Sequence, residues 1–347
     1  MKGFYRWAVM AVCACLLALP ATAAPYKSEY KLSVVPGATS GWGMTGTFFA
    51  DLVRERSQGR INIKVYHSSQ LLAGKQTSEF LLLRNGAIDF ALASTINWSP
   101  QIKELNLPAL PFFLAVQPDR YKAMDAILAG KSGKMMTQAV EKKGVKIIGW
   151  TENGFRELTT SKGPITKPED LRGLKIRVVG SPIFIETFRA LGANPVNMNW
   201  SEATTGFQQG VVDGQEGCFN NVVTLKFYEA QKYATQINYS VHSANIIASE
   251  RWLQSLPEKE RNALIRAGKE AMEYERTKVA GMLEADDKLM VEHGMELLGV
   301  VEDLPEWIRL GRTAWPKCYE VIGDGNAEKG KAVMDIVLAK KEALAKK

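Results

Sequence analysis

The chain has 347 residues, enough for two domains of ordinary size, and its 46% hydrophobic and 23% charged residues exclude disorder throughout. Lys and Arg number 44 against 37 Asp and Glu, a formal net charge of +7 without any long block of like charges, so we expect no nucleic-acid partner. Four cysteines are too few for a disulfide scaffold.

Residues 1–23 have the layout of a signal peptide. Lys2 and Arg6 precede an apolar stretch from Ala8 to Leu19, and Ala21-Thr22-Ala23 offers the small residues of a cleavage site. A retained signal anchor is the alternative, but this stretch is too short to cross about 30 Å of hydrocarbon as a helix. We therefore expect an exported protein, located in the periplasm of a bacterium.

The first part of the mature chain alternates between strand and helix patterns. We expect strands over Tyr30–Val35, Ile61–Val65 and Ile88–Ala93, because apolar residues alternate with polar ones or run together there. Helical spacing of apolar residues predicts helices over Met44–Gln58 and Thr77–Arg84. This order is typical of an open α/β sheet covered by helices.

The same order restarts in the second part of the chain. Strands are predicted over Val145–Trp150 and Leu174–Val179, and a helix begins at Ser181, with Pro182 at its first position. Two six-residue segments, 84–89 and 208–213, share a helix end, a Gly and an apolar pair before Asp. We therefore predict two similar α/β lobes.

A long helical segment runs from Pro257 to His293, interrupted by no further Pro and only by Gly268 and Gly281. As one helix it would be about 55 Å long and would reach across both lobes. Two helices broken near Gly281 are the alternative, since Gly costs about 1 kcal/mol in a helix interior.

The cysteines give no metal site. Cys13 and Cys15 lie in the signal peptide and leave with it, so Cys218 and Cys318 remain in an oxidising compartment. These two either form a disulfide or stay separate buried thiols, because connectivity cannot be read from sequence. No C-x-x-C or H-x-x-x-H spacing occurs, so we expect no metal ligand among them.

The chain carries no motif of a familiar enzyme class. There is no G-x-S-x-G nucleophile turn and no phosphate-binding P-loop. His67, His242 and His293 share no motif, and we interpret each as an ordinary surface or buried histidine. We therefore expect a binding protein without a cofactor rather than an enzyme.

Two arginines lie where open α/β sheets bind ligands, outside the carboxyl ends of strands. Arg177 is near the end of the strand Leu174–Val179, and Arg156 follows the strand Val145–Trp150 through a turn at Asn153–Phe155. Guanidinium groups at adjacent strand ends would form a fork that matches a carboxylate. A structural salt bridge is the alternative for either arginine.

A series of motifs resembles the solute-binding proteins of tripartite ATP-independent periplasmic (TRAP) transporters. Their order and spacing match over essentially the whole mature chain, and the series is far more specific than any one motif. The matching segments are Ser68–Leu71, Asn85–Asp89, Asn153–Lys162, Lys167–Val178, Ala190–Pro195, Trp200–Glu202, Val212–Glu216 and Lys226–Glu229.

The resemblance implies a two-lobed, type II-like periplasmic-binding-protein fold with a hinge of crossing strands and a long helix spanning both lobes. We expect residues 24–152 and 243–282 in lobe I, and residues 153–242 and 283–347 in lobe II. It also implies a monomer that captures an organic acid between the lobes and delivers it to a membrane permease.

The resemblance further implies site residues. Arg177 stands at the carboxylate-binding position, Arg156 at that of a second arginine, and Trp200 at that of an aromatic side chain packed on the ligand. Asn153 begins the same motif as Arg156 and joins the predicted site.

The sequence also departs from the family pattern. Gly217 stands where the family commonly has a ligand-contacting Asn, and Asn220 is the candidate replacement. In the first lobe, Ser94-Thr95 and Asn97-Trp98 replace residues that are often charged in sugar-acid binders, so Thr95, Trp98 and the loop residue Trp42 complete the predicted site. This lining favours a small or aromatic acid over a polyhydroxylated one, with a sulfonate as the alternative to a carboxylate.

Two other functions stay open at this point. A ligand-sensing subunit that docks on a signalling receptor would bind its solute equally well and would differ only in its partner. A secreted enzyme on the same lobes would need an acid–base pair, and fold alone does not exclude one.

Overall fold

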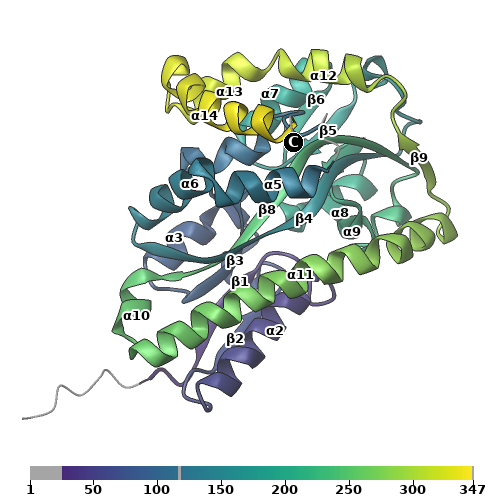
Figure 1. The fold of residues 1–347 in the computed structure, drawn as a ribbon. Helices are drawn as coiled ribbons and strands as arrows, with labels where there is room; N and C mark the ends of the chain where they lie inside the picture. Colours follow the sequence, from purple (N-terminus) through teal and green to yellow (C-terminus); the bar gives the residue numbers. More distant parts are fainter. Residues whose placement is uncertain (1–25, 116–118, 346–347) are drawn as a thin grey trace, which may run out of the picture.

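The computed structural model describes residues 26–115 and 119–345, so the predicted signal peptide, residues 1–23, lies outside the described residues. Within the described ranges, nine strands form one sheet in the order β2-β1-β3-β8-β4-β7-β5-β6, and β9 pairs with β8 outside this path. Helices cover both faces of the sheet (Figure 1).

The first strand group consists of β1 (Tyr30–Val34), β2 (Ile63–Tyr66) and β3 (Phe90–Ser94), all parallel. Helix α2 (Gly41–Arg56) follows β1, and α3 (Glu79–Arg84) precedes β3. The strand–helix alternation predicted for this part of the chain is confirmed. Strand β2 begins two residues later than predicted, because Ile61 packs in the core without pairing with β1.

The second strand group repeats this architecture. It consists of the parallel strands β5 (Lys175–Val178), β6 (Asn194–Asn197) and β7 (Gly214–Gly217). The helices between them are α7 (Pro182–Ala190) and α8 (Trp200–Gln208), and α7 begins with proline at its first position as predicted.

Two long strands connect the groups. β4 (Val145–Thr160) and β8 (Tyr233–Ser249) run antiparallel to each other; β8 pairs with β3, and β4 pairs with β7. The predicted strand after residue 145 is therefore much longer than expected. The turn expected around Gly154 is a bulge inside β4, where the register shifts between Glu152 and Phe155 and Gly154 has φ +85°.

The sequence repeat corresponds to a repeated structure. In the first strand group, the amide of Lys31 donates to Oδ2 of Asp89 at 2.9 Å, and the amide of Asp89 donates to the carbonyl of Lys31 at 3.0 Å. In the second group, Lys175 and Asp213 exchange the same two bonds at 2.9 and 2.8 Å. Each Asp therefore joins its loop to the first residues of a neighbouring parallel strand.

Helix α11 (Glu258–Glu292) is continuous, so the alternative of two shorter helices is wrong. Its first half packs on α2 and β4, and its second half reaches α9 and β9 (Figure 1). Gly268 is required by packing, because a Cβ there would lie 2.1 Å from Cγ2 of Ile148. Gly281 has no neighbouring atom within 4 Å of such a Cβ.

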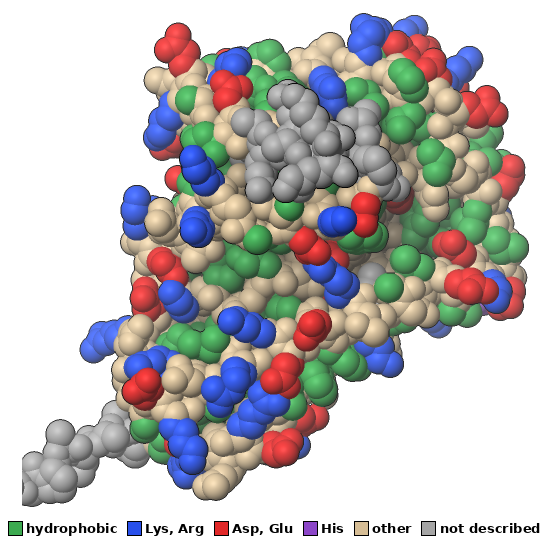
Figure 2. All heavy atoms as spheres, in the orientation of Figure 1, with side chains coloured by type: hydrophobic (Ala, Val, Ile, Leu, Met, Phe, Trp, Pro, Cys, Tyr) green, Lys and Arg blue, Asp and Glu red, His purple; other side chains and the backbone are tan. Residues whose placement is uncertain are grey.

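Ion pairs tie α11 to the elements beside it. Arg56 of α2 pairs with Glu270 at 2.6 Å, and Arg276 pairs with Glu152 of β4 at 2.6 Å and with Asp125 at 2.7 Å. Figure 2 shows acidic and basic side chains mixed along this face rather than gathered in one patch.

Both cysteines are buried and free, so the disulfide alternative is not realised. Cys218 follows β7, whereas Cys318 lies in α13, in the core formed by the C-terminal helices. The ranges of β9 and of the other α-helices are β9 (Glu296–Val300), α4 (Thr95–Trp98), α5 (Arg120–Ala129), α6 (Lys131–Glu141), α9 (Phe219–Thr224), α10 (Glu250–Ser255), α12 (Leu304–Arg312), α13 (Trp315–Ile322) and α14 (Ala327–Ala345).

Candidate functional site

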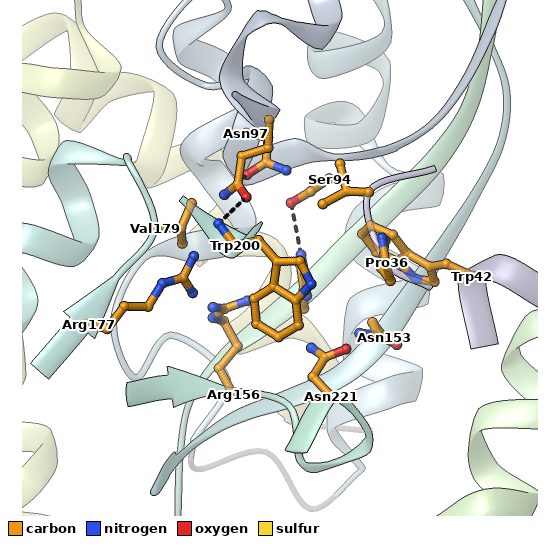
Figure 3. A pocket seen from close by; sticks show the side chains of 13 residues that line it. Pro36, Trp42, Ser94, Asn97, Asn153, Arg156, Arg177, Val179, Trp200 and Asn221 are labelled. Carbon is orange, nitrogen blue, oxygen red and sulfur yellow. Dashed lines mark hydrogen bonds between the residues drawn. The ribbon is translucent and has the colours of Figure 1, made fainter. Parts of the chain in front are cut away.

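A cavity lies between the two strand groups, beside the crossing strands. Its volume, measured as the space open to the centre of a water molecule, is about 40 Å³. Side chains from both groups point into it (Figure 3). The lining residues are Val35, Pro36, Trp42, Gln76, Ser94, Asn97, Asn153, Arg156, Arg177, Val179, Trp200, Asn221 and His242.

The structure brings together five of the eight predicted site residues. Arg177 and Trp200 come from the second strand group, Asn153 and Arg156 from β4, and Trp42 from α2. Their convergence follows from topology, because β4 runs between β8, which pairs with β3, and β7, which pairs with β5.

Two predicted residues of α4 lie elsewhere. The indole of Trp98 is fully buried in the core, where its Nε1 donates to Oε2 of Glu79 at 3.1 Å. The hydroxyl of Thr95 donates to the carbonyl of Ser243 at 3.3 Å. Both side chains are used by packing, and their neighbours Ser94 and Asn97 line the cavity instead.

Asn220 also lies outside this cavity. Its Nδ2 donates to Oδ1 of Asn153 at 2.6 Å, and it borders a separate hollow with Cys218 and Phe219. Asn221 is the residue of α9 that faces the cavity, because consecutive side chains on a helix point in directions about 100° apart.

Sequence reasoning missed the polar residues of the cavity that have no motif. Gln76 is the clearest case: its Nε2 donates to Oδ1 of Asn97 at 3.2 Å, and its Oε1 accepts from the amide of Trp200 at 2.9 Å. A lone Gln in a short helical turn gives no sequence pattern that would have identified it. The bond to Trp200 joins the two strand groups across the cavity.

Arg177 is 1% exposed and lies at the end of β5. Its Nε and Nη2 donate to the carbonyl of Met198 at 3.1 and 2.9 Å, and its guanidinium lies 5.4 Å from the centre of the Trp200 ring. Burial lowers the pKa of Arg177 to about 10, and the charge of Arg156 adds to this shift. It has no carboxylate partner among the described residues.

Arg156, by contrast, is neutralised inside the protein. Its Nε and Nη2 donate to Oε2 and Oε1 of Glu216 at 2.5 and 2.8 Å, and Tyr239 donates to the same carboxylate at 2.5 Å. The salt-bridge alternative therefore holds for this arginine. The expected two-arginine fork is not formed, because β7 lies between β4 and β5 and supplies Glu216.

His242 is hydrogen-bonded within the protein, in agreement with its interpretation as an ordinary histidine, but its place in the cavity wall on β8 was not predicted. Its Nε2 lies 2.8 Å from Oγ of Ser94, its Nδ1 lies 3.8 Å from Sγ of Cys218, and its ring packs 5.0 Å from that of Trp42. Burial and the charges of the two arginines hold the pKa of His242 well below its ordinary value. The ring is therefore neutral at physiological pH.

The described residues contain no group of three or more His, Cys, Asp or Glu side chains arranged to hold a metal ion. Among the described helices, none combines the length and the apolar character that crossing a membrane requires.

The chain is similar to known proteins. The family model DctP, bacterial extracellular solute-binding protein, family 7, matches residues 32–320. The chain is 31% identical over 252 residues to the 2,3-diketo-L-gulonate-binding periplasmic protein of Escherichia coli, covering 73% of this chain and 74% of that one. It is 29% identical over 314 residues to the C4-dicarboxylate-binding periplasmic protein of Rhodobacter capsulatus, covering 90% of each.

Solved structures of TRAP periplasmic solute-binding proteins share the fold. One from Ralstonia eutropha with bound (S)-2-acetolactate is 41% identical, with a TM-score of 0.82 over 93% of this chain and 100% of that one. Another, from Shewanella oneidensis with bound succinate, is 26% identical, with a TM-score of 0.81 over 90% and 99%. The predicted two-lobed α/β fold is confirmed.

Proposed function

Because the chain belongs to bacterial extracellular solute-binding protein family 7, we propose that it is the periplasmic receptor of a TRAP transporter. It captures a small organic acid between its lobes and delivers it to a membrane permease. The observation that carries this proposal is Arg177, a buried cation without a carboxylate partner among the described residues, which lines a cavity between the two strand groups.

Arg177 binds the acid group through the part of its guanidinium that the protein leaves open. The carbonyl of Met198 takes one N–H from Nε and one from Nη2, so the N–H groups of Nη1 and the second one of Nη2 remain. These remaining N–H groups lie at the end of the guanidinium and can donate two parallel hydrogen bonds to a carboxylate. The ring of Trp200 covers the guanidinium and excludes water from the pair.

Closure of the lobes completes the capture. The two predicted lobes, residues 24–152 with 243–282 and residues 153–242 with 283–347, meet inside β4, β8 and α11. Hydrogen bonds join them at the cavity: Trp200 donates its amide to Gln76 at 2.9 Å, Ser201 donates its hydroxyl to the carbonyl of Gly74 at 3.3 Å, and Oγ of Ser94 lies 2.8 Å from Nε2 of His242. A solute that contacts both lobes favours this arrangement.

The cavity favours a short solute. A space of about 10–15 Å³ on this measure holds one water molecule, so 40 Å³ suits an acid of a few heavy atoms rather than a hexuronate. The relatives named above bind acetolactate, succinate, C4-dicarboxylates or 2,3-diketo-L-gulonate, and each of these carries a carboxylate. We infer a carboxylate here too, and export by the signal peptide 1–23.

A thermal-shift screen of organic acids tests this function. The protein is first unfolded, dialysed and refolded, so that a co-purified solute cannot mask binding, and hits are confirmed by calorimetry. We expect short carboxylates to raise the melting temperature of the wild type and not that of Arg177→Ala. A sulfonate as the best ligand would correct the acid class. An empty screen, or equal responses in both proteins, would contradict the proposed function.

A further inference from the structure

We propose that the cavity selects a solute with one negative charge, the rest of which is uncharged and carries an oxo or hydroxy group. This rests on the proposed function and narrows it to one class of organic acid, the short oxo- or hydroxymonocarboxylates. Two features carry it: the balance of charges around the cavity, and a hydrogen-bonded Ser94–His242–Cys218 array, of which Ser94 and His242 line the cavity.

The charge balance leaves one cation for the solute. Arg156 and Arg177 are the only Lys or Arg among the lining residues. The charge of Arg156 is cancelled by Glu216, which is fully buried and makes two hydrogen bonds with it. Glu202 lies on the exposed side of α8 and accepts from the amide of Asn199, so it does not neutralise Arg177 inside the cavity. One uncompensated cation in a buried site matches one carboxylate.

The rest of the lining cannot balance a second carboxylate. Opposite the arginines, the cavity is bounded by Ser94, Asn97 and Trp42 from the first lobe (Figure 3). Gln76 of the same lobe also lines it, and none of these side chains is charged. The neutral ring of His242 also lines the cavity, 5.0 Å from the ring of Trp42. A second carboxylate there would be desolvated without a partner, which costs several kcal/mol in protein interiors.

The Ser94–His242–Cys218 array can present either a donor or an acceptor to the solute. Oγ of Ser94 already accepts from the amide of Ile96 at 3.2 Å, and it lies 2.8 Å from Nε2 of His242. Burial raises the pKa of Cys218 to about 12, so the thiol keeps its proton beside Nδ1.

If the thiol donates to Nδ1, the imidazole carries its proton on Nε2 and donates to Ser94. The Ser94 hydroxyl proton is then free to bond an oxo group in the cavity. If the thiol instead donates to the carbonyl of Gly154, which lies 3.8 Å from it, Nδ1 carries the proton and Nε2 accepts from Ser94. The remaining lone pair of Ser94 then accepts from a solute hydroxyl.

Four acids with the same carbon chain test the inference by calorimetry on the refolded full chain: butanoate, 2-oxobutanoate, 2-hydroxybutanoate and succinate. We expect the oxo and hydroxy acids to bind at least about 10-fold tighter than butanoate, the effect of one buried hydrogen bond. Succinate should bind at least about 10-fold more weakly than 2-oxobutanoate. Tighter binding of succinate than of both substituted acids would overturn the inference and leave the proposed function intact.

Binding by none of the four acids would also overturn the inference. It would contradict the proposed function as well only if the wider acid screen were also empty.

Ser94→Ala should lower the ratio of 2-oxobutanoate to butanoate affinity to about 1–3. Ser99→Ala is the matched control, because Ser99 is a buried hydroxyl beside the same helix that donates to the carbonyl of Ile96 and does not line the cavity. An unchanged affinity ratio in Ser94→Ala would show that the array does not take part in solute recognition.

Glu216→Gln tests the charge balance separately. The change leaves the charge of Arg156 uncompensated while keeping a side chain of the same shape, so the ratio of succinate to 2-oxobutanoate affinity should rise at least about 10-fold. An unchanged ratio in a variant shown by calorimetry to bind 2-oxobutanoate would contradict the charge argument. The wild-type comparison of the four acids does not depend on the folding of this variant.

Discussion

Arg177 donates two hydrogen bonds to a single carbonyl oxygen, that of Met198, at 3.1 Å from Nε and 2.9 Å from Nη2. This contact fixes the plane of the guanidinium and leaves its terminal N–H groups directed at the cavity. No carboxylate compensates the charge among the described residues, so burial lowers the pKa of Arg177 to about 10. The fold therefore holds a buried cation in one orientation without a carboxylate partner, which costs stability.

Replacing Arg177 should weaken solute binding. Truncating one member of a buried charge pair costs about 2–5 kcal/mol, so Arg177→Ala should lower affinity roughly 30-fold or more. Arg177→Lys keeps the charge and loses the two-point geometry, and its affinity should lie between the two. Calorimetry with the best acid of the screen measures both; wild-type affinity in Arg177→Ala would exclude it as the carboxylate site.

Replacing Arg177 with an uncharged side chain should not destabilise the unliganded protein. Arg177→Met fills a similar space without an uncompensated buried cation, so the unliganded melting temperature should rise or stay unchanged. Arg172→Met, at an exposed position, is the control and should shift it little. A large drop confined to Arg177→Met would show instead that this arginine is required for folding.

The two glycines of α11 should respond oppositely to the same substitution. Gly268→Ala places a Cβ 2.1 Å from Cγ2 of Ile148 and should destabilise by about 1–3 kcal/mol through overpacking. Gly281→Ala meets no atom within 4 Å and should stabilise by up to about 1 kcal/mol, the difference in helix propensity. Urea unfolding of both variants measures the difference; equal effects would contradict the packing described for Gly268.

Stability should fall as the pH rises towards 8, in part because of Glu275. This residue of α11 is fully buried, contacts the hydroxyl of Thr151, and burial raises its pKa to about 8. A carboxyl whose pKa is raised on folding stabilises most below its unfolded value, near 4.5, and this contribution is lost as the pH rises through 8.

Glu275→Gln should therefore flatten the decline in free energy of unfolding between pH 5 and 8, as measured by urea unfolding across that range. The exposed Glu273→Gln serves as the control and should leave the slope as in the wild type. An equally steep decline in Glu275→Gln would contradict a protonated Glu275 at neutral pH.

The two cysteines should be unreactive in the folded protein. Both are free and buried, and burial raises the pKa of each thiol to about 12, so little thiolate is present at pH 8. A chromogenic disulfide reagent should label both thiols only after denaturation, with the same yield with and without a reductant. Rapid labelling of the native protein would contradict this burial.

Solute should close the lobes through the contact between Gln76 and Trp200. Saturation with the acid should reduce the radius of gyration in small-angle scattering. Gln76→Ala should bind about 10-fold more weakly, the effect of losing about 1.4 kcal/mol of closure. Gln101→Ala is the control, because the Nε2 of Gln101 donates to the carbonyl of Thr77 within the same lobe. An unchanged radius with confirmed binding would count against closure.

Local patterns were sufficient to predict several elements of this protein. Residues 84–89 and 208–213 repeat the same loop, and the structure gives both the same pair of bonds between an Asp and a strand. The absence of proline between 257 and 293 indicated a long helix there, with two helices as the alternative, and strand-end placement with the motif predicted that Arg177 faces the cavity. Each of these depends on residues close together in the chain, which a sequence displays directly.

Only the tertiary structure decided how distant residues pair. Arg156 could not be separated from a ligand-binding role by its motif, because its partner Glu216 lies 60 residues away on the strand between β4 and β5. Trp98 and Asn97 are neighbours in sequence, yet one packs in the core and the other lines the cavity. His242 acquires its role from Ser94 and Cys218, since burial and hydrogen bonding are set by the fold around a side chain and not by its neighbours in sequence.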